Sequence, residues 1–281
     1  DIANIYKLQN EMETKTLSVW LTGGEMPKGT YDPDKEGIPI MLAMKLSPNA
    51  YFERVNRLLN DNPAYSEDGE LLSELAELGI GAGCSFKSSL SPVDLEKFWQ
   101  EMKDRLLPKL IEETSCFMVR NGNFKFYGDP ISRFGTQYGY RCLVAIAGFG
   151  ANPVDVAVYL KAEEDNKGEK LDAKNRYLLH FNADGLPPVG KYGFWSITAY
   201  GDDDFLISNP IERYAISNRN DFRLNDDNSL NLILQTEEPN ENRENWLPVG
   251  ERGFHLYLRI YRPGNSVLNG TWKAPKITKI D

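Results

Sequence analysis

The chain has 281 residues, of which 41% are hydrophobic, and carries a formal net charge of -9 at pH 7. This composition is typical of a globular protein, so a folded chain with a sizeable core is expected rather than disorder. Nucleic acids and anionic membrane surfaces bind to concentrated positive charge, and this acidic chain has no such Lys/Arg cluster. No apolar run reaches the length of a membrane span, so a soluble chain is predicted.

The first half of the chain carries start and stop signals for three helices. Each predicted helix follows a serine that can cap its first turn, and each meets Asn, Gly or Pro at its end. The predicted helices run from Ser47 to Asn62, from Ser66 to Gly79 and from Ser91 to Pro108, where the last should bend or break. In the third helix, Leu95, Phe98, Met102 and Leu106 share one face and are expected to point inward.

Two further segments complete the helical half. Tyr31–Pro39 has turn residues and no apolar period, which predicts an exposed connection that could act as a hinge. Tyr138–Gly150 returns to a helical apolar pattern just before the strand-rich half begins.

From residue 157 onward, apolar residues alternate with polar ones, which is typical of half-buried strands. In Phe254–Tyr261 the apolar residues occupy every second position. The predicted strands are Ala157–Leu160, Asn175–Phe181, Gly193–Tyr200, Leu230–Leu234 and Phe254–Tyr261. Polar turns between them predict an α+β protein, with a helical connector (residues 1–130) packed on a C-terminal antiparallel jelly-roll-like β-sandwich (131–281).

Familiar catalytic and metal motifs are weak in this sequence. The two histidines, His180 and His255, form no HxH or HExxH pair, so neither a metal nor another cofactor is expected. Asp202–Asp204 could hold calcium but is better interpreted as a solvated turn. Gly79–Gly83 follows a helix rather than a strand and is interpreted as a helix end instead of a phosphate loop.

The three cysteines, Cys84, Cys116 and Cys142, give neither a disulfide framework nor a CxxC metal pair. One disulfide among them remains open. Cys84 could act as a nucleophile if a histidine lay beside it in the fold, but a structural thiol is the favoured interpretation.

The polar face of the Phe254–Tyr261 strand is the strongest candidate site. His255, Tyr257 and Arg259 project from the same side, together with Tyr261. Aromatic rings and a guanidinium suit sugars or carboxylate-bearing ligands through stacking and bidentate hydrogen bonds. Tyr200, Arg213 and His180 are further candidates, but the sequence does not show to which side of the sheet their side chains project. The alternative is that this face is solvated or covered by the helical half, since tyrosine favours strands without binding anything.

Several motifs resemble a known pair of families. They are RYLLHFNADGLPPVGKYGFWSITAYGDDDFLISNPIERYAISNR, DDNSLNLILQTEEP, ENWLPV, FHLYLRIYRP and LNGTWKAPKI, preceded by YFERVNRLLNDNPAYSEDGELLSELAELGIGAGCSF and YGYRCLVAIAGFGANPVDVAVY. In this order they resemble the paired domain-of-unknown-function families 1254 and 1214, with the C-terminal part similar to the 1214-type domain. The resemblance implies an N-terminal β domain before the connector, whose trailing edge would be Asp1–Leu21. It also implies export to the periplasm or outside the cell, but no reaction.

Three functions follow as expectations. The leading one is an exported ligand-binding or interaction protein, directed at a small molecule or carbohydrate. A hydrolase-type enzyme with a site between the sandwich and the helical segment is one alternative, in which His180, His255 or acidic residues exchange protons. The other is a structural protein that assembles, for example as a homo-oligomer.

Overall fold

The computed structural model describes residues 2–29 and 39–280, which fall into two compact units separated between Leu46 and Ser47. The described part of the first unit is helical, with α1 (Ile2–Glu11), α2 (Leu17–Thr22) and α3 (Pro39–Met44). The Thr16 hydroxyl caps α2 by accepting a hydrogen bond from the Val19 amide at 3.3 Å. The predicted connection Tyr31–Pro39 lies outside the described residues except for Pro39, which begins α3.

The helices of the second unit begin close to the predicted positions. They are α4 (Pro48–Asp61), α5 (Gly69–Glu77), α6 (Pro92–Thr114) and α7 (Tyr138–Ala147). Ser47 caps α4, and the Ser91 hydroxyl both accepts from the Asp94 amide and donates to the Asp94 carboxylate at 2.7 Å. Ser66 instead begins a short 3-10 turn that leads into α5.

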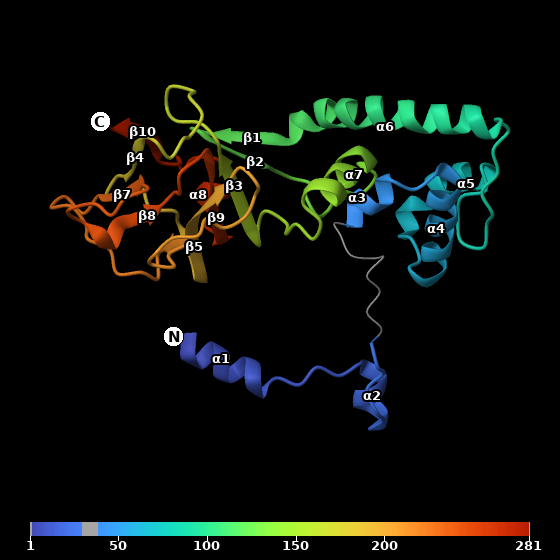
Figure 1. Ribbon diagram of the computed structural model, residues 1–281, viewed down its shortest axis with the longest axis horizontal. Coiled ribbons are helices and arrows are strands. Elements are labelled where there is room, and N and C mark those ends of the chain that lie inside the picture. The colour runs from blue at the N-terminus through green and yellow to red at the C-terminus, as the bar shows by residue number, and fades with distance from the viewer. Residues whose placement is uncertain (1, 30–38, 281) are drawn as a thin grey trace. The chain divides into compact units, whose positions relative to one another are not determined.

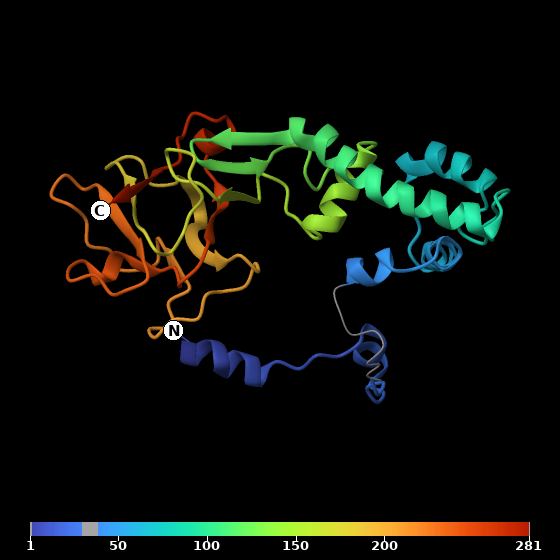
Figure 2. The same cartoon turned by 45° about the horizontal axis from the view of Figure 1, so that its top comes forward.

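Helix α6 differs from its prediction in two ways. It continues through Pro108 to Thr114, because α7 packs on its last turns, with Gly139 lying against Leu110. Among its described side chains, Leu95 and Trp99 are the buried apolar ones. Trp99 packs on two aromatic rings of α4, whereas Phe98 and Leu106 are more than half exposed. The prediction that Phe98 and Leu106 point inward is therefore wrong. In Figures 1 and 2, α6 leads from α4 and α5 to the first strand of the sheets.

A buried asparagine of α4 holds the glycine-rich loop that follows α5. Asn56 is 3% exposed. Its amide donates to the carbonyl oxygens of Gly79 and Cys84 at 2.9 and 3.1 Å, and its own oxygen accepts from the Gly81 amide at 2.8 Å. Gly79 has a φ of 71°, which is typical of a glycine that ends a helix. The predicted helix end at this glycine run is confirmed.

The larger sheet has six strands in the order β1-β2-β3-β9-β5-β6. All its pairs are antiparallel. The strands are β1 (Met118–Asn121), β2 (Phe124–Tyr127), β3 (Ala157–Ala162), β9 (Phe254–Pro263), β5 (Val189–Gly201) and β6 (Ala215–Ser217). The predicted division at residue 130 stays a prediction, and β1 and β2, which precede it, belong to this sheet.

The smaller sheet has four strands in the order β10-β4-β7-β8, of which only β7 and β8 are parallel. The strands are β10 (Lys276–Ile280), β4 (Arg176–Phe181), β7 (Leu230–Gln235) and β8 (Trp246–Pro248). The five strands predicted from alternating apolar residues are confirmed as β3, β4, β5, β7 and β9.

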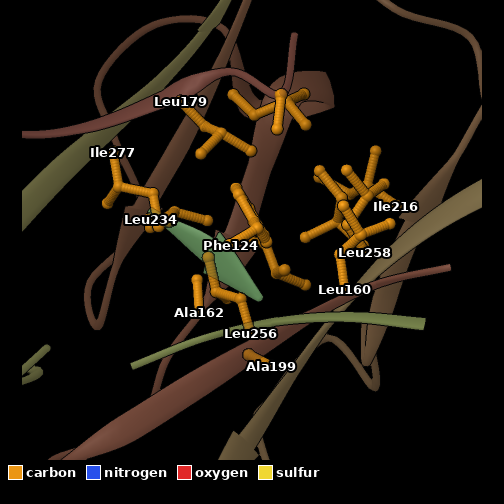
Figure 3. Packing of buried hydrophobic residues seen from close by; sticks show 14 of the residues in the cluster. Phe124, Leu160, Ala162, Leu179, Ala199, Ile216, Leu234, Leu256, Leu258 and Ile277 are labelled. Atoms are coloured by element: carbon orange, nitrogen blue, oxygen red, sulfur yellow. The ribbon is translucent and has the colours of Figure 1, made fainter. Parts of the chain in front are cut away.

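The two sheets share one buried core. Figure 3 shows Leu179, Leu234 and Ile277 of the smaller sheet beside Leu160, Leu256 and Leu258 of the larger one. Each of these six side chains is completely buried. The α+β class is therefore confirmed. Within residues 2–29 and 39–280, no helix is both long enough and apolar enough to cross a bilayer.

Candidate functional site

The central strand β9 divides its side chains between the core and the opposite surface of the larger sheet. Leu256, Leu258 and Ile260 face the core, so the intervening side chains project from the other side. Because β9 lies between β3 and β5, its neighbours contribute to the same surface. We use the name outer face for the part of this surface that is formed by Tyr159, Lys161, Tyr200, His255, Tyr257, Arg259 and Tyr261.

Arg259 lies at the centre of the outer face. Its guanidinium donates a hydrogen bond to the Tyr200 hydroxyl at 3.0 Å. The guanidinium carbon lies 5.4 Å from the centre of the Tyr200 ring and 5.0 Å from that of Tyr257. Within the described part of the chain, no carboxylate forms an ion pair with Arg259. The guanidinium therefore retains positive charge and unused N–H donors on a half-buried aromatic surface.

His255 occupies one end of the outer face and is 6% exposed. Its ring stacks on Tyr200, with the ring centres 5.7 Å apart and the planes 14° from parallel. The His255 Nε2 atom lies 3.2 Å from the Asp204 carboxylate but forms no hydrogen bond with it. This buried nitrogen is therefore left without a hydrogen-bond partner among the described residues.

Burial lowers the pKa of His255 below its ordinary value of 6.5, and the positive charge of Lys161 lowers it further. The carboxylates of Asp204, Glu163 and Asp202 act in the opposite direction with smaller effects. Lys161 itself pairs with Glu163 at 3.0 Å, and Lys125 also pairs with Glu163. Hydrogen bonds from these two lysines lower the pKa of Glu163 to about 2.

The lowered pKa of His255 predicts a pH-dependent stability. As pH falls below 6.5, the unfolded histidine binds a proton that folded His255 resists, so the free energy of unfolding should decrease. Below the folded-state pKa both states are protonated, and this contribution should level off. Chemical denaturation across this pH range should show a flatter profile for His255→Gln than for the wild type. His180→Gln is the matched control, and an unchanged slope in His255→Gln would contradict the prediction.

The β3 side of the outer face borders a pocket of about 460 Å³. Tyr159 and Tyr257 form its sheet side. The Asn152 amide donates a hydrogen bond to the Tyr159 hydroxyl at 2.7 Å, which adds a polar rim. The apolar wall comes from α7 and the segment after it, through Leu143, Val144, Ala147, Phe149 and Ala151. This size lies within the range of about 300–1,000 Å³ typical of small-molecule sites.

The structure brings together four of the six candidate residues. Tyr200, His255, Tyr257 and Arg259 are neighbours on the outer face, as the contacts above show. Arg213 is elsewhere, because its guanidinium donates to the Arg243 and Trp246 carbonyl oxygens at 2.7 and 2.9 Å and ties down the segment before β8. His180 projects from β4 of the smaller sheet, with Nδ1 2.7 Å from the Asn231 amide oxygen.

Several residues of the outer face and of the pocket beside it were not predicted from the sequence. Tyr159 and Lys161 alternate with buried Val158 and Leu160, so their outward facing could have been read from β3. Their position next to β9 could not, because strand order depends on contacts distant in sequence. The pocket wall from α7 gives no linear signal that connects it to Tyr257.

The other groups singled out in the sequence are the cysteines and the acidic run Asp202–Asp204. All three cysteines are free thiols. Asp202–Asp204 form the predicted turn after β5, in which the Asp203 carboxylate accepts from the Phe205 amide at 3.1 Å. Within the described residues, no group of three or more His, Cys, Asp or Glu side chains is arranged to hold a metal ion.

A family model described as "Protein of unknown function (DUF1214)" matches residues 156–265. This range contains every outer-face residue, and it supports the 1214-type assignment of the C-terminal part. The 1254-type part of the resemblance stays an expectation. No curated protein matches the chain.

Four chains of solved structures match this chain, and they include the following two. The VPA0106 protein from Vibrio parahaemolyticus matches with 24% identity and a TM-score of 0.65, over 95% of this chain and 62% of that one. An uncharacterized protein from Burkholderia cenocepacia matches with 15% identity and a TM-score of 0.33, over 69% of this chain and 44% of that one. The Vibrio match supports the fold alone, and this chain spans about three-fifths of that longer protein.

Proposed function

We propose that the protein binds a small ligand on the outer face, and that the ligand of the part around Tyr200 is a carbohydrate. The observation that carries this proposal is the half-buried Arg259 guanidinium between the Tyr200 and Tyr257 rings, without a carboxylate partner among the described residues. Aromatic rings offer flat apolar surfaces to a ligand ring, and a guanidinium offers several directed donors to hydroxyl or carboxylate oxygens. Both properties suit a sugar.

A glycan array and a thermal-shift screen test this proposal together. Wild-type protein should bind one class of glycan and gain thermal stability with it. Tyr200→Ala should weaken that binding about tenfold or more, because truncating an aromatic contact at the centre of a site has effects of this order. Tyr192→Ala is the matched control, since Tyr192 lies on the same strand, is 79% exposed and is not part of the outer face. If the wild-type protein binds no glycan on the array and gains no thermal stability in the screen, the carbohydrate proposal is wrong.

One observation favours the hydrolase alternative. Buried His255 lacks a hydrogen-bond partner at Nε2 and has the Asp204 carboxylate 3.2 Å away, which is an arrangement that can exchange a proton with a ligand. His180, on the other sheet, adds nothing to that arrangement. Hydrolysis of the bound glycan by wild-type protein, lost in His255→Gln, would select this alternative over binding alone.

The broader expectations are part of the same proposal. The family resemblance supports export to the periplasm or outside the cell. It also supports a functional pairing with a 1254-type domain. The shared core of the two sheets supports a jelly-roll-like sandwich, and symmetric assembly remains the third functional alternative. Cell fractionation and the mass of the protein in solution test location and assembly separately.

A further inference from the structure

The pocket beside the outer face has a chemistry different from that of the sugar surface around Tyr200. Its wall is formed by aliphatic side chains of α7, among them buried Val144 and exposed Ala147. Phe149, which also lines the pocket, is 90% exposed. An aromatic side chain left this exposed at an apolar pocket loses favourable burial that an apolar ligand would restore.

The polar groups of this pocket lie on its sheet side. Asn152 and Tyr159 form one hydrogen-bonded pair there. Tyr257 forms the edge toward Arg259, whose guanidinium carbon is 5.0 Å from the centre of the Tyr257 ring. Arg259 makes one hydrogen bond, to the neutral Tyr200 hydroxyl, and has no ion-pair partner among residues 2–29 and 39–280. A half-buried guanidinium in this situation favours an incoming anion.

We infer that the pocket binds a carboxylic acid with an apolar body, whose carboxylate pairs with Arg259 while its chain or ring packs against the α7 wall. This inference rests on the proposed function only in taking the outer face as a ligand-binding surface. It adds a ligand class that the pocket selects. In this pocket, a neutral polyhydroxylated ligand could accept hydrogen bonds from the guanidinium, but it would leave the positive charge without an ion-pair partner and would place hydroxyl groups against aliphatic carbon.

Calorimetric titration of the wild-type chain with octanoate tests the ligand class. Octanoate should bind, and octanamide, which has the same chain without the charge, should bind at least about tenfold more weakly. Acetate, which lacks the apolar body, should show no measurable binding. Hexanoate should bind about fifteenfold more weakly than octanoate, because each buried methylene contributes about fourfold.

Two variants locate the site. Arg259→Gln should weaken octanoate binding at least about tenfold and leave octanamide binding unchanged. Ala147→Trp should weaken both by filling the pocket mouth. Arg57→Gln on α4 and Ala145→Trp on α7 are matched controls at exposed positions that do not line the pocket, and both should bind octanoate as the wild type does.

The outcomes separate this inference from the carbohydrate proposal. Absence of octanoate binding, equal binding of octanoate and octanamide, or full octanoate affinity in Arg259→Gln would each overturn the inference, whatever the glycan array shows. Octanoate binding that depends on Arg259, with a silent glycan array, would support the inference and reject the carbohydrate. If Ala147→Trp does not fold, the contrast between octanoate and octanamide in Arg259→Gln still decides.

Discussion

Replacing Asn56 by alanine should lower the free energy of unfolding by about 2–4 kcal/mol, because a buried polar group that loses its partner costs about 1–3 kcal/mol. The substitution removes all three hydrogen bonds that Asn56 makes to the loop after α5. The Gly79 and Cys84 carbonyl groups and the Gly81 amide would lose their side-chain partner together. Urea denaturation should report the loss as a lower midpoint with an unchanged slope.

Asn60 provides the matched control for Asn56. It lies one turn further along the same helix and accepts a hydrogen bond from the Gly83 amide at 2.9 Å, in an exposed setting. Since water can replace this bond, Asn60→Ala should lower the free energy of unfolding by less than about 1 kcal/mol. Equal losses in the two variants would show that burial of Asn56 does not determine the stability of the loop.

The second large effect is expected at Leu258, in the middle of β9. Its side chain is completely buried in the core shared by the two sheets. Leu258→Ala should lower the free energy of unfolding by about 3–4 kcal/mol, through lost apolar burial and the cavity left behind. Leu258→Met, which nearly conserves volume, should cost less than about 1.5 kcal/mol. A loss below about 1 kcal/mol for Leu258→Ala would contradict the packing around β9.

The same pair of variants tests the separation of the two faces. Leu258 lies between Tyr257 and Arg259 in sequence but projects from the opposite side of the sheet. Leu258→Met should therefore keep the octanoate affinity of the wild type. If it lost that affinity while remaining folded, the core and the outer face would be coupled more tightly than their separation across the sheet implies.

Strand facing was predictable from the sequence because it depends on the period of the side chains alone. Alternation in Phe254–Tyr261 placed His255, Tyr257 and Arg259 on one side, and the structure agrees. The neighbours of that strand were not predictable, because β3 and β5 pair with it across long stretches of sequence. Arg213 shows the same limit, since its partners are carbonyl groups some thirty residues further along the chain.

In the helices, local sequence signals predicted the N-terminal caps but not which apolar residues become buried. Caps at Ser47 and Ser91 were correct because capping is a contact within one turn. The inward side of α6 was only partly correct, because which apolar residues become buried depends on the partner that packs there. Trp99 rather than Phe98 meets the α4 rings.

The position of β9 also determines when the outer face can exist during synthesis. Its residues lie on three strands, and β9, which joins the other two, is the last of them to leave the ribosome. A nascent chain that ends before Phe254 has β3 and β5 without the strand that both require, and their edges are open to wrong pairing. The outer face therefore forms only after β9 has been translated, and a ligand of that face could not assist folding before that point.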